Sequence, residues 1–239
     1  MYAHKITMVS AIVFDFDCTI TSHHVFNFLH NNIIPIDIIN DLGSEMPHEM
    51  IYHINKIIMF SKTHSTNSQE QYINFIVNVL FGGIQRINKL RTLFKFIKQS
   101  NYKLIIASRG QLEDITFFLK YLDLYDYFDI ILATSNHKLH IKSELLSIES
   151  KIGKEKLLDN MISSGYQNII YIDDNPTEFT KLKHEKVTHE IGKNIYKCIF
   201  SGIFCNFIFI GTLKLDGLGM GDHEINTIKD SILRIANAI

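Results

Sequence analysis

Residues 11–19 read Ala-Ile-Val-Phe-Asp-Phe-Asp-Cys-Thr, a short apolar run that stops abruptly at two aspartates, Asp15 and Asp17. A continuous apolar run of this length is typical of a strand buried on both faces of a parallel sheet. In such sheets ligands bind outside the carboxyl ends of the strands. We therefore expect Asp15 and Asp17 to point into one cleft at the end of a buried strand.

Three later segments repeat this form, a short apolar run that ends at a polar residue: 103–107 before Ser108, 128–133 before Thr134, and 168–172 before Asp173. Between these runs, apolar residues recur at intervals of three and four, which is the spacing of an amphipathic helix. Strands that alternate with amphipathic helices predict an α/β fold, a doubly wound parallel sheet covered by helices on both faces.

The segment 21–83 breaks this alternation, because it offers helical stretches but no apolar run suited to a core strand. We interpret it as a mainly helical cap inserted after the first strand, over the cleft. Residues 1–20 and 84–239 then form the α/β core domain. Toward the C-terminus we expect one or more strands within 191–215 and a helix over 224–238.

The composition of the chain indicates which binding partners and which cellular compartment to expect. The 239 residues include 24 Lys and Arg against 25 Asp and Glu, a formal net charge of -1. Balanced charge provides no overall field to attract nucleic acid or anionic lipid, so we expect neither partner. Three cysteines, an odd number, favour a reducing compartment and a cytoplasmic protein. The apolar segment 198–210 is shorter than the roughly 20 residues that span a bilayer, so we interpret it as buried strands rather than a membrane span.

The two aspartates of the first motif can divide the work of phosphoryl transfer. One carboxylate can attack phosphorus, while the other protonates the leaving oxygen and later deprotonates water. The pattern Asp15-x-Asp17-x-Thr19 also occurs in calcium-binding loops and helix-capping turns, so alone it is moderate support. His23 and His24 follow directly, and we interpret them as the start of the cap rather than as substrate contacts.

The second strand is followed by Ser108, Arg109 and Gly110. The Ser108 hydroxyl and neighbouring backbone N–H groups can hold phosphate oxygens at a helix N-terminus, although Ser108 could equally cap that helix. The guanidinium of Arg109 can grip a phosphate bidentately. Lys151 and Lys154 precede a later helix, and either ammonium could balance the charge of the phosphoryl group.

Asp173 and Asp174 follow the fourth strand. Like charges repel at a strand end unless a cation joins them, so this pair indicates a metal site. Mg²⁺ prefers carboxylate oxygens, phosphate and water, and we expect it to be held by Asp15, Asp17, Asp173 and Asp174.

Taken in order, the set Asp15-x-Asp17-x-Thr19, Ser108, Lys151 or Lys154, and Asp173-Asp174 resembles the four motifs of the haloacid-dehalogenase-like phosphohydrolase superfamily. The insertion after the first motif is similar to the helical cap of the branch that includes phosphoserine phosphatase. The resemblance spans the chain from Ala11 to about Phe179. One departure is Cys18, at a position where that superfamily frequently has glycine.

The resemblance implies roles for individual residues. Asp15 would be the nucleophile that forms an aspartyl-phosphate, and Asp17 the general acid and base that also binds the metal through its backbone carbonyl. Thr19 would steady the first loop and Ser108 would bind phosphate. Either Lys154 or Lys151 would balance charge, and Asp174 beside Asp173 would complete the Mg²⁺ site.

From residues and resemblance together we expect a Mg²⁺-dependent phosphatase that hydrolyses a small phosphomonoester through an aspartyl-phosphate. Two alternatives stay open at this point. The enzyme could act on a macromolecule, such as a phosphoprotein or a nucleic-acid end. The chain could instead be a non-catalytic binding protein with the same fold.

Overall fold

The computed structural model describes residues 9–31, 77–78, 80–134, 154–175, 187–192, 195–200, 203–211 and 219–237. These residues contain a seven-stranded sheet with the order β3-β2-β1-β4-β7-β6-β5. Strands β1 to β4 and β7 run parallel, and β6 and β5 extend the sheet antiparallel. Their bounds are Val9–Phe14 (β1), Lys103–Gln111 (β2), Ile130–Thr134 (β3), Tyr166–Asp173 (β4), Val187–Gly192 (β5), Ile195–Phe200 (β6) and Ile203–Gly211 (β7).

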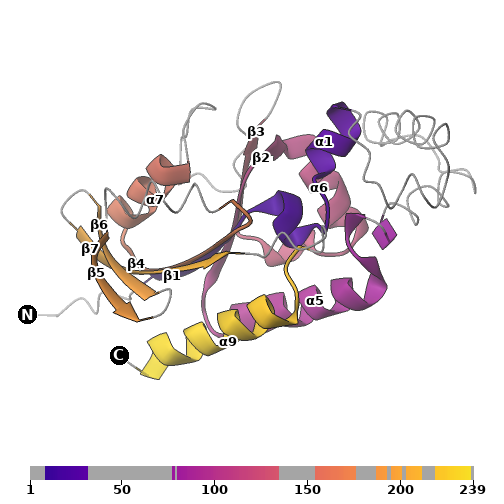
Figure 1. Ribbon diagram of the computed structural model, residues 1–239. Helices are drawn as coiled ribbons and strands as arrows, with labels where there is room; N and C mark the ends of the chain where they lie inside the picture. The colour runs from indigo at the N-terminus through magenta and orange to yellow at the C-terminus, as the bar shows by residue number, and fades with distance from the viewer. Residues whose placement is uncertain are drawn as a thin grey trace, which may run out of the picture.

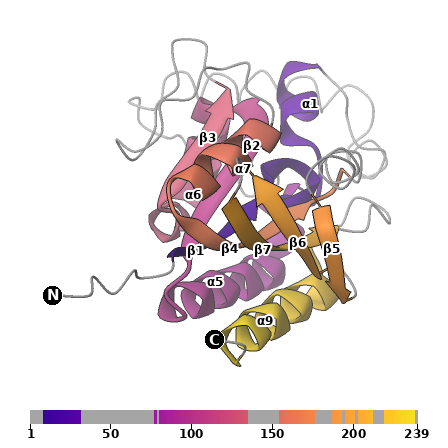
Figure 2. The same ribbon diagram turned by 90° about the vertical axis from the view of Figure 1, so that its left-hand side faces the viewer.

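Helices cover both faces of this sheet. Figures 1 and 2 show α5 and α9 side by side beneath it, with α7 on the opposite side. The described helices and helical turns are η1 (Phe16–Ile20), α1 (Val25–His30), α5 (Gly83–Gln99), α6 (Leu112–Tyr121), η2 (Tyr125–Tyr127), α7 (Lys154–Ser163) and α9 (Asp222–Asn237).

Successive side chains of β1 point to opposite faces of the sheet, and a separate hydrophobic core lies on each face. Ile12 and Phe14 belong to a core that also contains the apolar faces of α5, α6 and α9. Ala11 and Val13 belong to a second core, formed with α7. All four side chains are fully buried, and complete burial of an Ile or Phe contributes about 1.5 to 3 kcal/mol. The expected doubly wound α/β fold is therefore confirmed.

The strand order identifies where a ligand should bind. After β1 the chain moves to β2 and β3 on one side, whereas β4 pairs with β1 on the other. In open α/β sheets the crevice at such a reversal is the ligand site. Asp15 directly follows β1 and Asp173 ends β4, so both lie at this crevice.

The strands expected late in the chain are confirmed by β6 and β7, and the terminal helix by α9. The segment 198–210 contributes to these strands, and Ile208, Phe209 and Ile210 are buried. Within the ranges described above, no helix is long and apolar enough to cross a membrane. The cytoplasmic location stays a prediction.

Of the expected cap, the structure describes its beginning, with α1, and its return to the core at residues 77–78 and 80–83. Residues 32–76 and 79 lie outside the described ranges. The division into a core of 1–20 and 84–239 and a helical cap of 21–83 therefore stays a prediction.

Candidate active site

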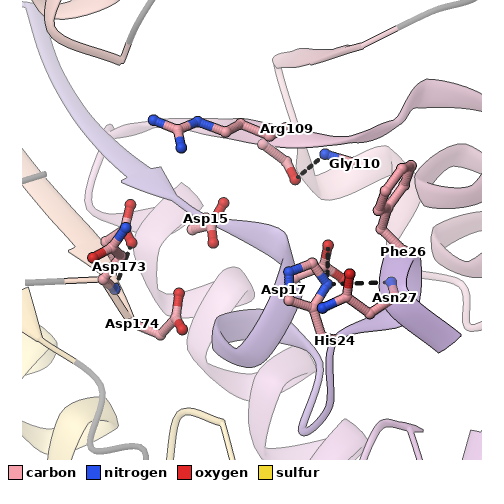
Figure 3. A pocket seen from close by; sticks show the side chains of 11 residues that line it. Asp15, Asp17, His24, Phe26, Asn27, Arg109, Gly110, Asp173 and Asp174 are labelled. Carbon is pink, nitrogen blue, oxygen red and sulfur yellow. Dashed lines mark hydrogen bonds and ion pairs between the residues drawn. The ribbon is translucent and has the colours of Figure 1, made fainter. Parts of the chain in front are cut away.

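A cavity of about 300 Å³ opens at the carboxyl ends of β1, β2 and β4 (Figure 3). Three separate segments of the chain supply the residues around it. They are Asp15, Asp17, His24, Phe26 and Asn27 from the first segment, Ser108, Arg109 and Gly110 from the second, and Asp173, Asp174 and Asn175 from the third.

The first loop begins as a continuation of the sheet. The backbone N–H of Asp15 donates to the carbonyl of Ile172 at 2.9 Å, and Asp15 lines the cavity with 6% exposure. The chain then turns sharply, because Cys18 adopts a left-handed conformation with φ 56° and ψ 14°. Glycine reaches this conformation at little cost, which explains physically why glycine suits this position.

Thr21 braces the turn with its side chain. Its Oγ1 accepts a hydrogen bond of 3.0 Å from the Cys18 N–H and lies within hydrogen-bond distance of the carbonyl oxygens of Phe16 and His23. The backbone N–H of Thr21 also donates to the Phe16 carbonyl, at 3.0 Å. One fully buried hydroxyl thus fixes both sides of the turn that follows the aspartates.

Asp17 is held separately from Asp15. Its Oδ1 accepts a hydrogen bond of 2.8 Å from the backbone N–H of Val25, the first residue of α1. Its Oδ2 lies 3.2 Å from Nδ1 of His24. Figure 3 shows the Asp17 carboxylate turned toward α1, on the side of the pocket away from Asp173.

The contact with Asp17 changes the acidity of His24. A hydrogen bond from the imidazole to Asp17 raises the pKa of His24, burial opposes this effect, and the charges of Asp17, Asp15 and Asp174 add to it. Nδ1 of His24 also lies 3.5 Å from the backbone N–H of Asn27. A protonated Nδ1 cannot accept that N–H, so we take the shorter contact with Asp17 as the one that orients the ring.

A bulge in β2 presents the second group of residues. Pairing with β3 is regular up to Ala107 and resumes only at Gln111, where the register has shifted. Bulges of this kind re-aim side chains and are common beside active sites. Ser108 lies in the bulge, and its Oγ accepts a hydrogen bond of 3.0 Å from the Gly110 N–H. The N-cap of α6 is Gln111, so Ser108 does not cap that helix.

Gly110 lies where this bulge comes near the first loop. A Cβ at this position would lie 3.3 Å from Ser108 Oγ and 3.5 Å from Asp17 Oδ2. Arg109 lines the same part of the cavity, and Figure 3 shows it extending over the side where Asp15 lies.

Three carboxylates gather at the crevice between β1 and β4. Oxygen atoms of Asp15, Asp173 and Asp174 all lie within 4.8 Å of one another. Asp173 is fully buried, and its two oxygens accept hydrogen bonds of 3.0 Å from the Tyr171 hydroxyl and 2.8 Å from the Asn175 N–H. Such a group of like charges is destabilising unless a cation neutralises it, and hard oxygen ligands suit Mg²⁺. The residues therefore fit a magnesium ion.

The expected site residues fall into three groups. Asp15, Asp17, Ser108, Arg109, Gly110, Asp173 and Asp174 line the cavity together. Thr19 does not line it: this residue belongs to the first loop but is fully buried, and its Oγ1 has no hydrogen-bond partner among the described residues. Lys154 begins α7 but its side chain is not described, and Lys151 lies outside the described ranges.

Four lining residues were not expected from the sequence: His24, Phe26, Asn27 and Asn175. His24 was interpreted as the start of the cap without a role in the site. His24 lies seven residues after Asp17, and this interval matches no helix or strand periodicity because the turn between the two residues has an irregular backbone. The signal that could have indicated a role for His24 in the site was the pair His23-His24 soon after the loop of Asp15 and Asp17.

Solved structures with a similar fold include proteins described as phosphatases. A phosphoserine phosphohydrolase-like protein from Francisella tularensis subsp. tularensis SCHU S4 is 18% identical, with a TM-score of 0.37 over 74% of this chain and 83% of its own. A predicted phosphatase from Clostridium acetobutylicum is 14% identical, with a TM-score of 0.43 over 97% of this chain and 100% of its own. An HAD phosphatase from Thermococcus onnurineus is 16% identical, with a TM-score of 0.34 over 70% and 78%.

No protein-family model and no curated protein sequence matches the chain. Likeness to solved structures at this distance assigns no activity, so the chemistry is argued from the residues of the cavity.

Proposed function

We propose that this protein is a Mg²⁺-dependent phosphatase that hydrolyses a phosphomonoester through an aspartyl-phosphate on Asp15. One observation carries the proposal. The carboxylate of Asp15 lies close to those of Asp173 and Asp174. The carboxylate of Asp17, two residues away in the sequence, is instead held by contacts with the Val25 N–H and with His24. Two neighbouring carboxylates in different environments can perform different steps.

In the first step a carboxylate oxygen of Asp15 attacks phosphorus, and the bond between phosphorus and the leaving alcohol oxygen breaks. Asp17 donates its proton to that oxygen. In the second step Asp17 takes a proton from water, which attacks the aspartyl-phosphate and releases inorganic phosphate and free Asp15. General acid–base catalysis of this kind contributes about 10² to 10⁴ in rate.

The charge that develops on the phosphoryl group needs compensation. Mg²⁺ held by Asp15, Asp173 and Asp174 would neutralise negative charge on the phosphate, with the backbone carbonyl of Asp17 as a further ligand. The Ser108 hydroxyl and the N–H groups around Arg109 and Gly110 would hold the phosphate oxygens. Lys154 or Lys151 would supply an ammonium, and Arg109 a guanidinium.

The cavity and the charge both favour a small substrate. A volume of about 300 Å³ suits a small ligand rather than a folded partner. The net charge of -1 supplies no field for a nucleic acid. Every carboxylate that the chemistry needs is present, which favours an enzyme over a binding protein.

The experiment is hydrolysis of a generic aryl phosphate by the purified protein, with Mg²⁺ and with excess EDTA. We expect turnover only with the metal, because three carboxylates repel a phosphate when their charge is not neutralised. Asp15→Asn, which keeps the size of the side chain, is the control and should be inactive. Full turnover in EDTA, or by Asp15→Asn, would contradict the proposal.

A further inference from the structure

Arg86, on the first turn of α5, binds four backbone carbonyl groups with a single guanidinium. Nη2 donates to Thr19 O at 2.9 Å, and Nη1 donates to Ile20 O at 2.6 Å and Phe81 O at 3.1 Å. Nε donates to Met220 O at 3.1 Å. Two of the four acceptors belong to the loop that carries Asp15 and Asp17.

The other two acceptors connect that loop to distant parts of the chain. Phe81 lies where the insertion returns to the core, and Met220 lies just before α9. The N–H of Met220 also donates to Thr19 O, at 3.0 Å. Gly219 permits this approach, since a Cβ there would lie 2.2 Å from Thr21 O and 2.6 Å from Arg86 Nη2.

The guanidinium is a partly buried cation. Burial lowers the pKa of Arg86 to about 10, against the opposing effect of the Glu224 charge. The side chain therefore stays protonated at neutral pH, and its hydrogen bonds are charge-assisted. Bonds of this kind are roughly twice as strong as neutral ones.

The loop needs such support because it is strained. Cys18 has φ 56°, a left-handed conformation that costs a residue with a Cβ about 1 to 2 kcal/mol. Strained residues persist only where their surroundings over-determine the conformation. Thr21 fixes the backbone at Cys18 from one side, and Arg86 fixes Thr19 and Ile20 from the other.

We propose that Arg86 is a positioning residue, which holds the loop of Asp15 and Asp17 in its reactive geometry through the carbonyl groups of Thr19 and Ile20. This inference rests on the proposed phosphatase function. Arg86 is absent from the cavity lining, so its influence on the reaction passes through the loop.

The primary test compares Arg86→Lys with Arg91→Lys in steady-state hydrolysis of an aryl phosphate. An ammonium cannot reproduce the planar fork that reaches four carbonyls. Because small misplacements of reacting groups can cost about 10²-fold, we expect kcat to fall about 10- to 100-fold in Arg86→Lys. KM should change little, because Arg86 does not line the cavity.

Arg91→Lys is the matched control. Arg91 lies on the same helix and also binds a carbonyl, with Nη2 donating to Leu122 O at 2.6 Å, but none of its hydrogen bonds reaches the first loop. We expect Arg91→Lys to lose no more thermal stability than Arg86→Lys does, and to keep the wild-type kcat. Arg86→Gln is the second variant, since it keeps N–H donors without leaving a partly buried charge poorly paired.

A second readout does not depend on activity. Cys18 lies in the loop and is partly exposed, so its alkylation rate, followed by mass spectrometry of the peptide that contains it, reports opening of the loop. Arg86→Lys or Arg86→Gln should raise this rate, and Arg91→Lys should not.

The outcomes separate the two proposals. If the wild type is active and the Arg86 variants keep kcat within about twofold, or alkylate Cys18 at the wild-type rate, the positioning role is wrong and the phosphatase proposal stands. If the wild type is inactive with Mg²⁺, the proposed function fails, and the catalytic role of Arg86 fails with it. If neither Arg86 variant folds, the residue supports the whole fold rather than this loop.

Discussion

Oδ1 of Asp17 accepts a hydrogen bond of 2.8 Å from the backbone N–H of Val25. Val25 is the first residue of α1, where N–H groups have no partner within the helix. The carboxylate satisfies one of them and is thereby oriented toward the helix rather than toward the acidic group of Asp15. Because α1 follows the first motif closely in the sequence, a short local segment is sufficient to hold the carboxylate of Asp17 away from that of Asp15.

His24 makes the second contact with Asp17, and we expect it to support catalysis. His24→Ala should lower kcat roughly tenfold, the effect of losing about 1.4 kcal/mol from one hydrogen bond to a charged group. His23→Ala is the control, because His23 is adjacent in sequence but does not line the cavity. Equal losses in the two variants, measured in one steady-state assay, would contradict this role.

Lys154 and Lys151 should differ sharply in their effect on turnover. Lys154 is the first residue of α7, whereas Lys151 precedes that helix in the sequence, and we expect only one of the two lysines to reach the cleft. Lys154→Ala should lower kcat/KM about 100-fold, the loss of roughly 2.7 kcal/mol expected for one preorganised charge stabiliser. Lys151→Ala should change little. The reverse pattern would assign the charge-balancing role to Lys151.

Cys18→Gly should stabilise the protein. Relief of the left-handed strain is worth about 1 to 2 kcal/mol, against a loss of about 0.4 to 1 kcal/mol from the greater freedom of glycine in the unfolded chain. We expect a net gain of roughly 0.5 to 1 kcal/mol in the free energy of unfolding, measured with urea. Cys18→Ala keeps the Cβ and should give no gain. Equal stabilities of the two variants would mean that the backbone is not strained there.

The lowered pKa of Asp129 predicts how the stability of the protein depends on pH. Burial alone would raise the pKa of Asp129, but hydrogen bonds from Lys98, Leu104 and Lys103 outweigh it and lower the pKa. An acid with a lowered pKa stabilises the fold above its unfolded pKa of about 3.9, and this contribution is lost as the pH falls through the folded value.

The measurement compares Asp129→Asn with the wild type in urea at neutral pH and near pH 3. We expect the variant to be less stable by roughly 1 kcal/mol at neutral pH, and the difference to shrink at the lower pH. Asp126→Asn, at an exposed position in η2, is the control. A difference that grows as the pH falls would contradict the direction given for Asp129.

The sequence predicted the sheet and most of the site because both depend on local pattern. Continuous apolar runs specify strands buried on two faces, and the polar residues that end them necessarily meet at one edge. Asp15 and Asp173 were therefore predictable from their positions at strand ends. Ser108 was predictable from the end of an apolar run, although β2 continues past it to Gln111.

The remaining features depend on backbone geometry, which leaves no side-chain pattern. The β2 bulge arises from its register with β3, and a single strand does not encode that register. Among the described residues, Arg86 donates its hydrogen bonds to carbonyl groups, which every residue possesses. In sequence it therefore resembles any surface arginine on an amphipathic helix. Thr19, which the family resemblance suggested would steady the first loop, is fully buried and does not line the cavity.

Detection of the phosphorylated residue tests the central claim most directly. Asp17→Asn keeps the nucleophile but removes the base, so an aryl phosphate with an activated leaving group should phosphorylate it and the adduct should accumulate. After an acid quench, mass spectrometry should locate phosphate on the peptide that contains Asp15, and Asp15→Asn should show none. Phosphate on Ser108 or on a histidine instead, or near-normal turnover by Asp15→Asn, would contradict the mechanism.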